Sequence, residues 1–256
     1  MDEERAAGWF PAAGTAALDA IVRTPERAGI LLDFDGTLGP IVERPGLAVL
    51  AKGARAALTR LAARYRVVAT ISGRTQEELA RLVDADGVRL VGLYGLGTGS
   101  VSADVISAVG AAAAEVEGAW VEPKGPTVAV HFRAAPDAEA AARTLKRYLA
   151  PLAGRSSMEL AFGKRVVELV PAGRPLKEGA VERIVDEERL SMALYAGDDV
   201  ADLRAFAALD RACASGRLQL AVKVAVRGAD TPAELVAAAD IVLEGPEEMV
   251  EVLDRL

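Results

Sequence analysis

The residues of this chain that could carry out chemistry are acids, one lysine and one hydroxyl, and they stand next to short apolar segments or at the start of a predicted helix. They are Asp33, Asp35, Ser72, Lys177, Asp198, Asp199 and Asp202. A site that gathered them would hold an excess of carboxylates and would need a cation to be stable. Hard carboxylate oxygens favour Mg²⁺, which keeps part of its water shell and shares the rest with a substrate phosphate.

The segments around these residues are typical of a parallel α/β sheet. Residues 28–32 and 66–71 are apolar without alternation, as expected for strands buried on both faces. Similar runs predict strands at 88–93, 192–196, 220–226 and 241–243. Helices are predicted at 47–64, after the capping box Thr75–Glu78, and at 177–187, 201–209 and 246–256. Because the carboxyl ends of parallel strands meet at one edge, we expect the candidate residues to share that edge.

A middle region follows a different pattern. Helices are predicted at 101–116 and 136–152, and hairpin strands at 119–122, 127–133, 157–160 and 164–170, the last pair turning around Phe162 and Gly163. Ser72 and Lys177 lie 105 positions apart. A strand–helix repeat needs roughly 30 residues, so about 70 are left over. The sequence therefore predicts an inserted α+β domain at 103–174 between core segments 1–102 and 175–256.

Composition excludes several classes of protein. Acids outnumber bases 37 to 30, and no basic run suited to nucleic acid is present. Cys213 and His131 are the only residues of their types, which excludes internal disulfides and cysteine- or histidine-rich metal sites. No apolar run of 18 residues occurs, and the first residues are acidic, unlike a signal peptide. We therefore expect a cytoplasmic protein that binds neither nucleic acid nor membrane and acts as a monomer.

Four motifs in order resemble those of the haloacid dehalogenase (HAD) phosphatase superfamily. Asp33–Leu38 looks like the first motif, Ser72–Arg74 the second, Lys177 the third, and Gly197–Asp202 the fourth. The resemblance implies a Rossmann-like HAD core with a Mg²⁺-dependent phosphatase activity. An insertion between the second and third motifs resembles a type-2 cap, which covers the active site and selects the substrate.

The resemblance implies a role for each motif residue. Asp33 would be the nucleophile that forms an aspartyl-phosphate, and Asp35 would act as general acid and then as general base. Lys177 would offset the negative charge of the phosphate and the carboxylates. Hydroxyls and exposed backbone N–H groups would hold the phosphoryl oxygens. These phosphate-binding positions are Gly36, Thr37, Ser72 and Gly73.

The resemblance also implies a metal site. Mg²⁺ would lie on Asp33, the backbone carbonyl of Asp35, and Asp198, with Asp199 or Asp202 in support. Asp199 and Asp202 could instead cap the helix that follows them. Ser72 is likewise compatible with a helix-capping role.

Within the superfamily the chain is most similar to the trehalose-6-phosphate phosphatases. The similarity covers the segments 32–38, 71–74, 121–124, 130–133 and 167–171. Charged side chains in these segments could bind the hydroxyls of a sugar, although exposed sheet faces are normally polar for no functional reason. The candidate substrate-binding residues are Arg74, Glu122, Lys124, His131, Arg133 and Glu168.

One segment departs from the family pattern. Where the family often reads Gly-Asn-His-Gly-x-Glu, this chain has Gly92–Gly97, in which Tyr94 takes the place of the histidine and Gly97 that of the acid. The leading hypothesis is hydrolysis of trehalose 6-phosphate. The alternatives are another sugar phosphate, such as sucrose phosphate, a glycosyl-phosphoglycerate or a trehalose-like analogue, and a non-catalytic regulatory partner of a sugar synthase.

Overall fold

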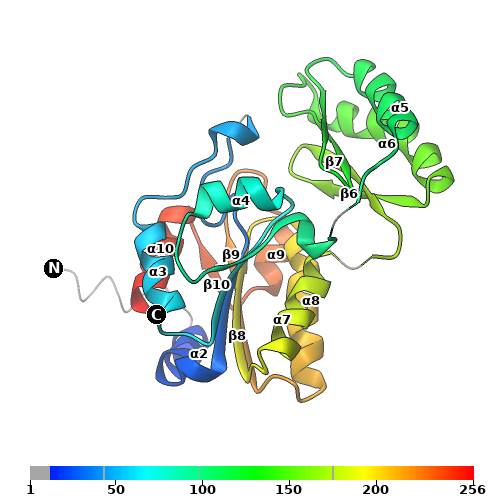
Figure 1. The fold of residues 1–256 in the computed structure, drawn as a ribbon. Helices are drawn as coiled ribbons and strands as arrows, with labels where there is room; N and C mark the ends of the chain where they lie inside the picture. The colour runs from blue at the N-terminus through cyan, green and yellow to red at the C-terminus, as the bar shows by residue number, and fades with distance from the viewer. Residues whose placement is uncertain (1–11, 43, 98, 175) are drawn as a thin grey trace. The chain divides into compact units, whose positions relative to one another are not determined.

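The computed structural model describes residues 12–42, 44–97, 99–174 and 176–256. The chain divides into two compact units, which are described separately (Figure 1). The core unit consists of Met1–Gly95 with Lys177–Leu256, and the inserted unit is Leu96–Leu176. The expected domain at 103–174 falls inside the inserted unit.

The core unit is built on a six-stranded parallel sheet in the order β10-β9-β8-β1-β2-β3. This confirms the parallel α/β fold that the apolar runs predict. The central strand β1 pairs with β2 on one side and β8 on the other, and all five of its residues are buried. The strands are β1 Ala28–Leu32, β2 Val67–Ile71, β3 Arg89–Val91, β8 Met192–Gly197, β9 Leu220–Val226 and β10 Ile241–Leu243.

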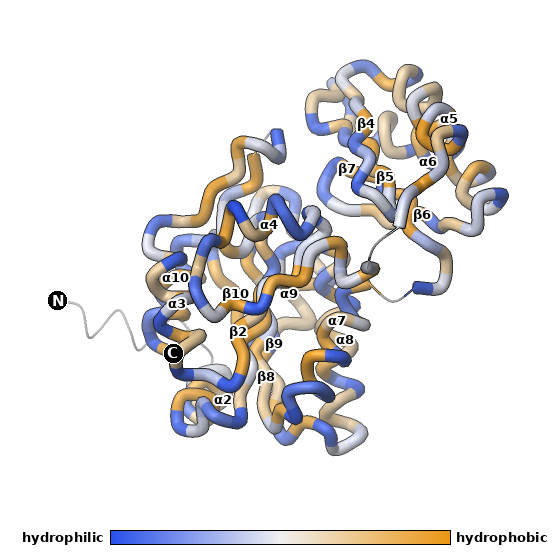
Figure 2. Tube along the Cα trace, viewed as in Figure 1, coloured by the Kyte–Doolittle hydropathy of each residue, from blue (hydrophilic) through white to orange (hydrophobic). Residues whose placement is uncertain are grey.

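Helices cover both faces of this sheet. On one face α2, α3, α4 and α10 pack against side chains such as Ile30 and Leu32. On the other, α7, α8 and α9 pack against side chains such as Leu31, because successive strand residues point to opposite faces. Figure 2 shows hydrophobic residues concentrated along the core strands. The helices are α2 Ala12–Arg23, α3 Ala54–Ala62, α4 Gln76–Val83, α7 Lys177–Glu187, α8 Val200–Ala214, α9 Ala233–Ala238 and α10 Pro246–Arg255.

Three predictions about the core were clearly wrong in their bounds, and one of them is the helix expected over 201–209, which extends to Ala214. The helix expected from residue 47 begins only at Ala54, because Pro45–Leu47 forms a short 3-10 turn and the helix is preceded by Gly53 in a left-handed conformation. The strand expected over 88–93 ends at Val91, because the chain then turns through the 3-10 segment Gly92–Gly95. Helices α2 and α9 were not predicted.

The inserted unit has a four-stranded antiparallel sheet in the order β4-β5-β7-β6. Two helices, α5 and α6, pack on one face through residues such as Val109, Leu145 and Val130. The turn expected at Phe162–Gly163 lies two residues later, because β6 continues to Gly163 and Arg165 takes the left-handed conformation. The elements are α5 Ala103–Ala114, β4 Trp120–Pro123, β5 Val128–His131, α6 Ala138–Arg155, β6 Met158–Gly163 and β7 Val166–Pro171.

Among the described residues, no helix combines the length and the apolar character needed to cross a bilayer.

Candidate active site

The order of the strands brings the first, second and fourth motifs together. Asp33 follows β1, Ser72 follows β2 and Asp198 follows β8, and these three strands are neighbours in the sheet. The backbone N–H of Asp33 donates to the carbonyl of Ala196 at 2.9 Å, so the pairing of β1 with β8 continues up to Asp33. All three polar side chains are buried.

Lys177 joins this group from the first residue of α7. Its Nζ lies 2.8 Å from Asp33 Oδ1 and 2.6 Å from Asp202 Oδ1, and the side chain is only 4% exposed. Burial lowers the pKa of Lys177, but the carboxylates of Asp202 and Asp33 outweigh it and hold the pKa well above its usual value. The lysine is therefore a permanent positive charge against the proposed nucleophile.

Both carboxylate oxygens of Asp202 accept hydrogen bonds. Its Oδ1 accepts from Lys177 Nζ and from the hydroxyl of Tyr195 at 2.7 Å. Its Oδ2 accepts from the backbone N–H groups of Asp198 and Asp199, each at 2.9 Å. Because both oxygens already serve two donors, Asp202 is suited to hold the loop after β8 in place. The sequence offered no signal for Tyr195, which lies within an apolar strand.

The helix-capping alternative also describes the last two acids of the fourth motif. Asp199 is the N-cap of α8, and its Oδ1 accepts from the N–H of Val200 at 2.6 Å. Asp202 completes the capping box by accepting from the N-cap N–H. Both acids thus stabilise the start of α8, where they also face the positive end of the helix dipole.

The buried carboxylates form a group with the chemistry of a magnesium site. Asp33, Asp198 and Asp202 each offer an oxygen, and these oxygens lie within 4.8 Å of one another. Burial raises the pKa of Asp33 well above its usual value, and Asp202 and Asp198 raise it further against the opposing effect of Lys177. The carboxylates are hard oxygen donors, so the residues present fit Mg²⁺. Asp33 and Asp198 are the side chains suited to bind it, since the oxygens of Asp202 are engaged.

Two glycines leave room for the closely packed acids of the site. A Cβ on Gly36, whose φ is +81°, would lie 1.8 Å from Asp198 Oδ2. A Cβ on Gly197 would lie 2.1 Å from Cγ of Asp202. Neither position has room for a side chain. Thr37, the next residue of the first motif, is fully buried, and its hydroxyl has no hydrogen-bond partner within the described part of the chain. A buried hydroxyl of this kind points to a ligand that supplies the partner.

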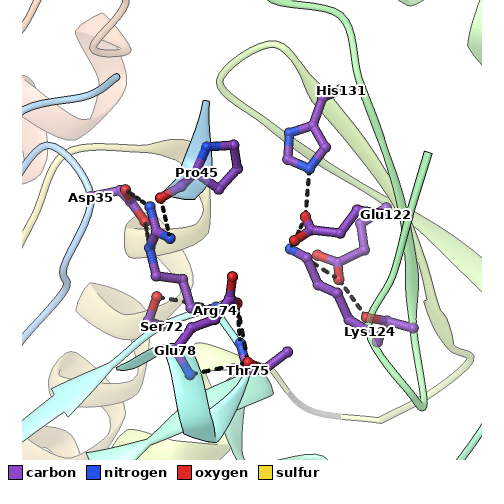
Figure 3. A network of polar contacts seen from close by, with 11 residues as sticks. Asp35, Pro45, Ser72, Arg74, Thr75, Glu78, Glu122, Lys124 and His131 are labelled. Atoms are coloured by element: carbon purple, nitrogen blue, oxygen red, sulfur yellow. Dashed lines mark hydrogen bonds and ion pairs between the residues drawn. The ribbon is translucent and has the colours of Figure 1, made fainter. Parts of the chain in front are cut away.

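Arg74 lies against Asp35 (Figure 3). Its Nε and Nη2 donate to the two carboxylate oxygens at 2.8 and 2.7 Å, and its Nη1 donates to the carbonyl of Pro45 at 3.1 Å. The guanidinium carbon also lies 5.3 Å from the centre of the Phe34 ring. Arg74 is 7% exposed, and Ser72 Oγ accepts from its backbone N–H. The residue expected to contact substrate therefore holds the proposed general acid in this structure.

The inserted unit brings four of its five candidate residues together on the sheet face away from α5 and α6. Glu122 Oε2 lies 2.7 Å from His131 Nε2 and 3.5 Å from Lys124 Nζ (Figure 3). Lys124 Nζ lies 3.9 Å from Glu168, which accepts a hydrogen bond from Thr127 Oγ1 at 2.5 Å. We call Glu122, Lys124, His131 and Glu168 the polar cluster.

In the polar cluster, the acids lie next to basic groups, and an aromatic ring packs beside them. Burial raises the pKa of Glu122, but His131 and Lys124 outweigh it and the pKa lies below its usual value. Trp120 stacks on His131 with ring centres 4.1 Å apart, and it is 39% exposed. Trp120, which the sequence predicts as a core or interface residue, and Thr127 were not among the candidate site residues. Arg133 lies beyond the end of β5, and its carbonyl accepts a hydrogen bond from Arg165.

The protein has the HAD fold. Its parallel α/β core is interrupted by an antiparallel inserted unit, and an Asp-x-Asp motif follows the central strand of the core. The C-terminal domain of Candida albicans trehalose-6-phosphate phosphatase superposes with a TM-score of 0.80 at 22% identity, over 96% of this chain and 97% of that one. The trehalose-phosphatase family model matches residues 31–238, so the chain belongs to the trehalose-phosphatase family.

Relatives in sequence are longer proteins. A trehalose-phosphate phosphatase of Mycobacterium tuberculosis is 32% identical over 253 residues, which cover 89% of this chain and 60% of that protein. An uncharacterized glycosyl hydrolase of the same organism is 34% identical over 210 residues, which cover 73% of this chain and 16% of that protein. The chain thus spans between a sixth and three fifths of the length of these relatives.

Proposed function

We propose that the protein is a Mg²⁺-dependent phosphoric monoester hydrolase that converts trehalose 6-phosphate and water to trehalose and phosphate. The observation that carries the proposal is the buried ion pair of Lys177 with Asp33, at 2.8 Å, beside Asp198 at the carboxyl edge of the sheet. A non-catalytic regulatory domain would have no need for this grouping, which is costly to bury. Membership of the trehalose-phosphatase family supports the choice of substrate.

Two carboxylates carry out the reaction in two halves. In the first, an oxygen of Asp33 attacks phosphorus while the bond between phosphorus and the sugar oxygen breaks, and Asp35 protonates the departing oxygen. In the second, Asp35 takes a proton from water, whose oxygen attacks the phosphorus of the aspartyl-phosphate. This step releases inorganic phosphate and restores the Asp33 carboxylate.

The surrounding residues stabilise the charges. Lys177 keeps its positive charge next to Asp33, where negative charge gathers on the phosphoryl group. The hydroxyls of Thr37 and Ser72 hold the phosphoryl oxygens. Asp33 and Asp198 would hold Mg²⁺, which would supply further positive charge against the carboxylates and the phosphate.

Arg74 has to change partner during the reaction. Asp35 lies as a carboxylate in a two-point ion pair with Arg74, so it must leave this pair and take up a proton from water before it can protonate the sugar oxygen. The released guanidinium then offers its N–H groups to the substrate, which is the role expected of Arg74 from the sequence.

Recognition of the sugar belongs to the polar cluster. A disaccharide presents many hydroxyls, and charged groups at fixed positions bind them well. The contacts among Glu122, Lys124 and His131 fix these side chains before substrate binds. The cluster and the catalytic residues lie on one chain, so we propose that a monomer is sufficient. We place the reaction in the cytoplasm, where a lone cysteine without an internal disulfide is normal.

The test is phosphate release from trehalose 6-phosphate, sucrose 6-phosphate and glucose 6-phosphate, with Mg²⁺ and with EDTA. We expect a strong preference for the trehalose ester that disappears in EDTA. Asp33→Asn should abolish turnover while its circular dichroism spectrum stays that of the wild type. Asp19→Asn, on the exposed side of α2, is the matched control and should be fully active.

Two results would count against the proposal. Substantial turnover by Asp33→Asn would exclude Asp33 as nucleophile. Metal-dependent hydrolysis of p-nitrophenyl phosphate without preference for the trehalose ester would leave the chemistry intact and refute the substrate.

A further inference from the structure

Trp120 lies at an edge of the sheet of the inserted unit, beside the polar cluster. It is the first residue of β4, an outer strand of the order β4-β5-β7-β6, and it pairs with His131 of β5. Side chains two positions apart on a strand share a face and lie about 7 Å apart, so Trp120 is on the same face as Glu122. The indole therefore borders the charged groups of the polar cluster.

One side of the indole is covered and the other is open. The ring planes of Trp120 and His131 are 12° from parallel with their centres 4.1 Å apart, so His131 covers the inner side of the indole. Within the described part of the chain, no further strand pairs with the outer side of β4. Trp120 is accordingly 39% exposed, whereas His131 is buried. The outer side of the ring is thus accessible to a ligand.

Trp120 differs in its location from the other large apolar side chains that are exposed on the inserted unit. Tyr148 lies on α6. Phe162 pairs with Val167, whose side chain packs against the helices on the opposite face of the sheet. Of the exposed large apolar residues described in this unit, Trp120 alone lies on the face of the polar cluster. This is the one place where an open aromatic ring adjoins charged side chains held in fixed positions.

An open aromatic face beside fixed charged groups matches the surface of a pyranose ring. The hydroxyls of such a sugar project around its rim, and its C–H groups lie on its two faces. Charged side chains bind the hydroxyls. The electron-rich face of an indole attracts the weakly positive C–H groups, and the contact also removes apolar area from water.

We propose that Trp120 stacks on a pyranose ring of the substrate while the polar cluster binds the hydroxyls of that ring. The stacking on His131 holds the indole in place before the sugar binds, which reduces the entropy that binding would cost. This role deepens the proposed function and rests on it for a sugar substrate, but it does not require the sugar to be trehalose.

A kinetic test compares Trp120→Ala and Trp120→Phe with wild type. It measures kcat and KM for trehalose 6-phosphate, and the inhibition constant of inorganic phosphate, which carries no sugar. For Trp120→Ala we expect KM to rise about ten-fold relative to that inhibition constant, with a smaller change in kcat, as for loss of one stacking contact. Trp120→Phe keeps a ring and should recover part of the loss. Phe162→Ala removes a ring of similar exposure, 38%, from the opposite face, and as the matched control it should keep the wild-type KM.

Fluorescence gives a second readout, which a purely structural role of Trp120 would not change. Trp9 and Trp120 are the only tryptophans in the sequence, and Trp9 lies outside the described residues. In the variant Trp9→Phe, tryptophan emission therefore reports on Trp120. We expect trehalose to shield this indole from quenching by acrylamide in a saturable way, and glycerol at the same concentration to leave the quenching unchanged. Trp120 stays in place in this variant, so the measurement stands even if Trp120→Ala is unstable.

Two results would overturn the proposal. One is that Phe162→Ala raises KM as much as Trp120→Ala does. The other is that none of trehalose, sucrose and maltose shields Trp120 from acrylamide. Failure of the proposed function gives a different pattern: sucrose shields the indole and sucrose 6-phosphate is the ester hydrolysed, in which case Trp120→Ala should raise KM for that ester.

Discussion

Asp202→Asn is expected to weaken the fold and the site together. The wild-type carboxylate receives four donors, two on each oxygen: Lys177 and Tyr195 on one, and the N–H groups of Asp198 and Asp199 on the other. An asparagine has one acceptor oxygen and one NH₂ group. Whichever way it turns, the NH₂ faces one pair of buried donors, and the negative charge beside Lys177 is lost.

The four contacts set the magnitude of the effect. Hydrogen bonds to charged groups contribute about 1.5–3 kcal/mol each, and two of them lose their acceptor. Lys177 keeps Asp33 as a partner, which limits the loss. We therefore expect the free energy of unfolding to fall by about 3–5 kcal/mol, the range found when one member of a buried ion pair is removed.

Urea denaturation followed by circular dichroism measures this difference. Tyr195→Phe removes one donor to the carboxylate and leaves the other three, so it should cost about 1.5–3 kcal/mol, less than Asp202→Asn. The denaturant slope of both variants should equal that of wild type, which shows that the same surface is exposed. If Asp202→Asn lies within 1 kcal/mol of wild type, or loses no more than Tyr195→Phe, Asp202 does not hold the loop after β8 and the assignment fails.

Two further predictions concern the metal and the pH range. In Gly36→Ala the new Cβ would displace Asp198, so Mg²⁺ titration of activity should require at least about ten-fold more metal, whereas Gly46→Ala, with open space around it, should match wild type. Because the folded-state pKa of Lys177 is raised, its stabilising effect is complete below the unfolded lysine pKa of about 10.4 and is lost as pH rises through the folded value. Lys177→Arg keeps its charge, so its urea midpoint should decline less than that of wild type between pH 9 and 11; identical declines would contradict the raised pKa.

The core strands were predictable because burial on both faces leaves an uninterrupted apolar run. The predicted bounds of β1, β9 and β10 equal those in the structure. The start of α3 was not predictable in this way, since Leu47 and Leu50 share the spacing of Leu58 and Leu61 without belonging to the helix. The exposure of Leu47 depends on the path of the loop after β1, which spacing alone does not encode.

For the site, too, local sequence patterns predict part of the arrangement, and the rest depends on how distant segments pack. Motif order and strand ends were enough to expect that Asp33, Ser72 and Asp198 share one edge. The pairing of Arg74 with Asp35 joins residues 39 positions apart and depends on how two loops approach. The Tyr195 hydroxyl donates a hydrogen bond from inside an apolar strand, so the surrounding sequence gives no indication of its polar role.

Because β1 lies between β2 and β8 in the sheet, the proposed catalytic site cannot assemble during synthesis until both neighbouring strands have been made. Asp33, the proposed nucleophile, is synthesised before the inserted unit, whereas Lys177, β8 and Asp198 are synthesised after it. The inserted unit has its own hydrophobic core and contiguous sequence, so it can fold while the core unit is still half a sheet. Until β8 arrives, the growing chain presents an open β1 edge next to an incomplete acid cluster, so the proposed site cannot form before the inserted unit and β8 have been made.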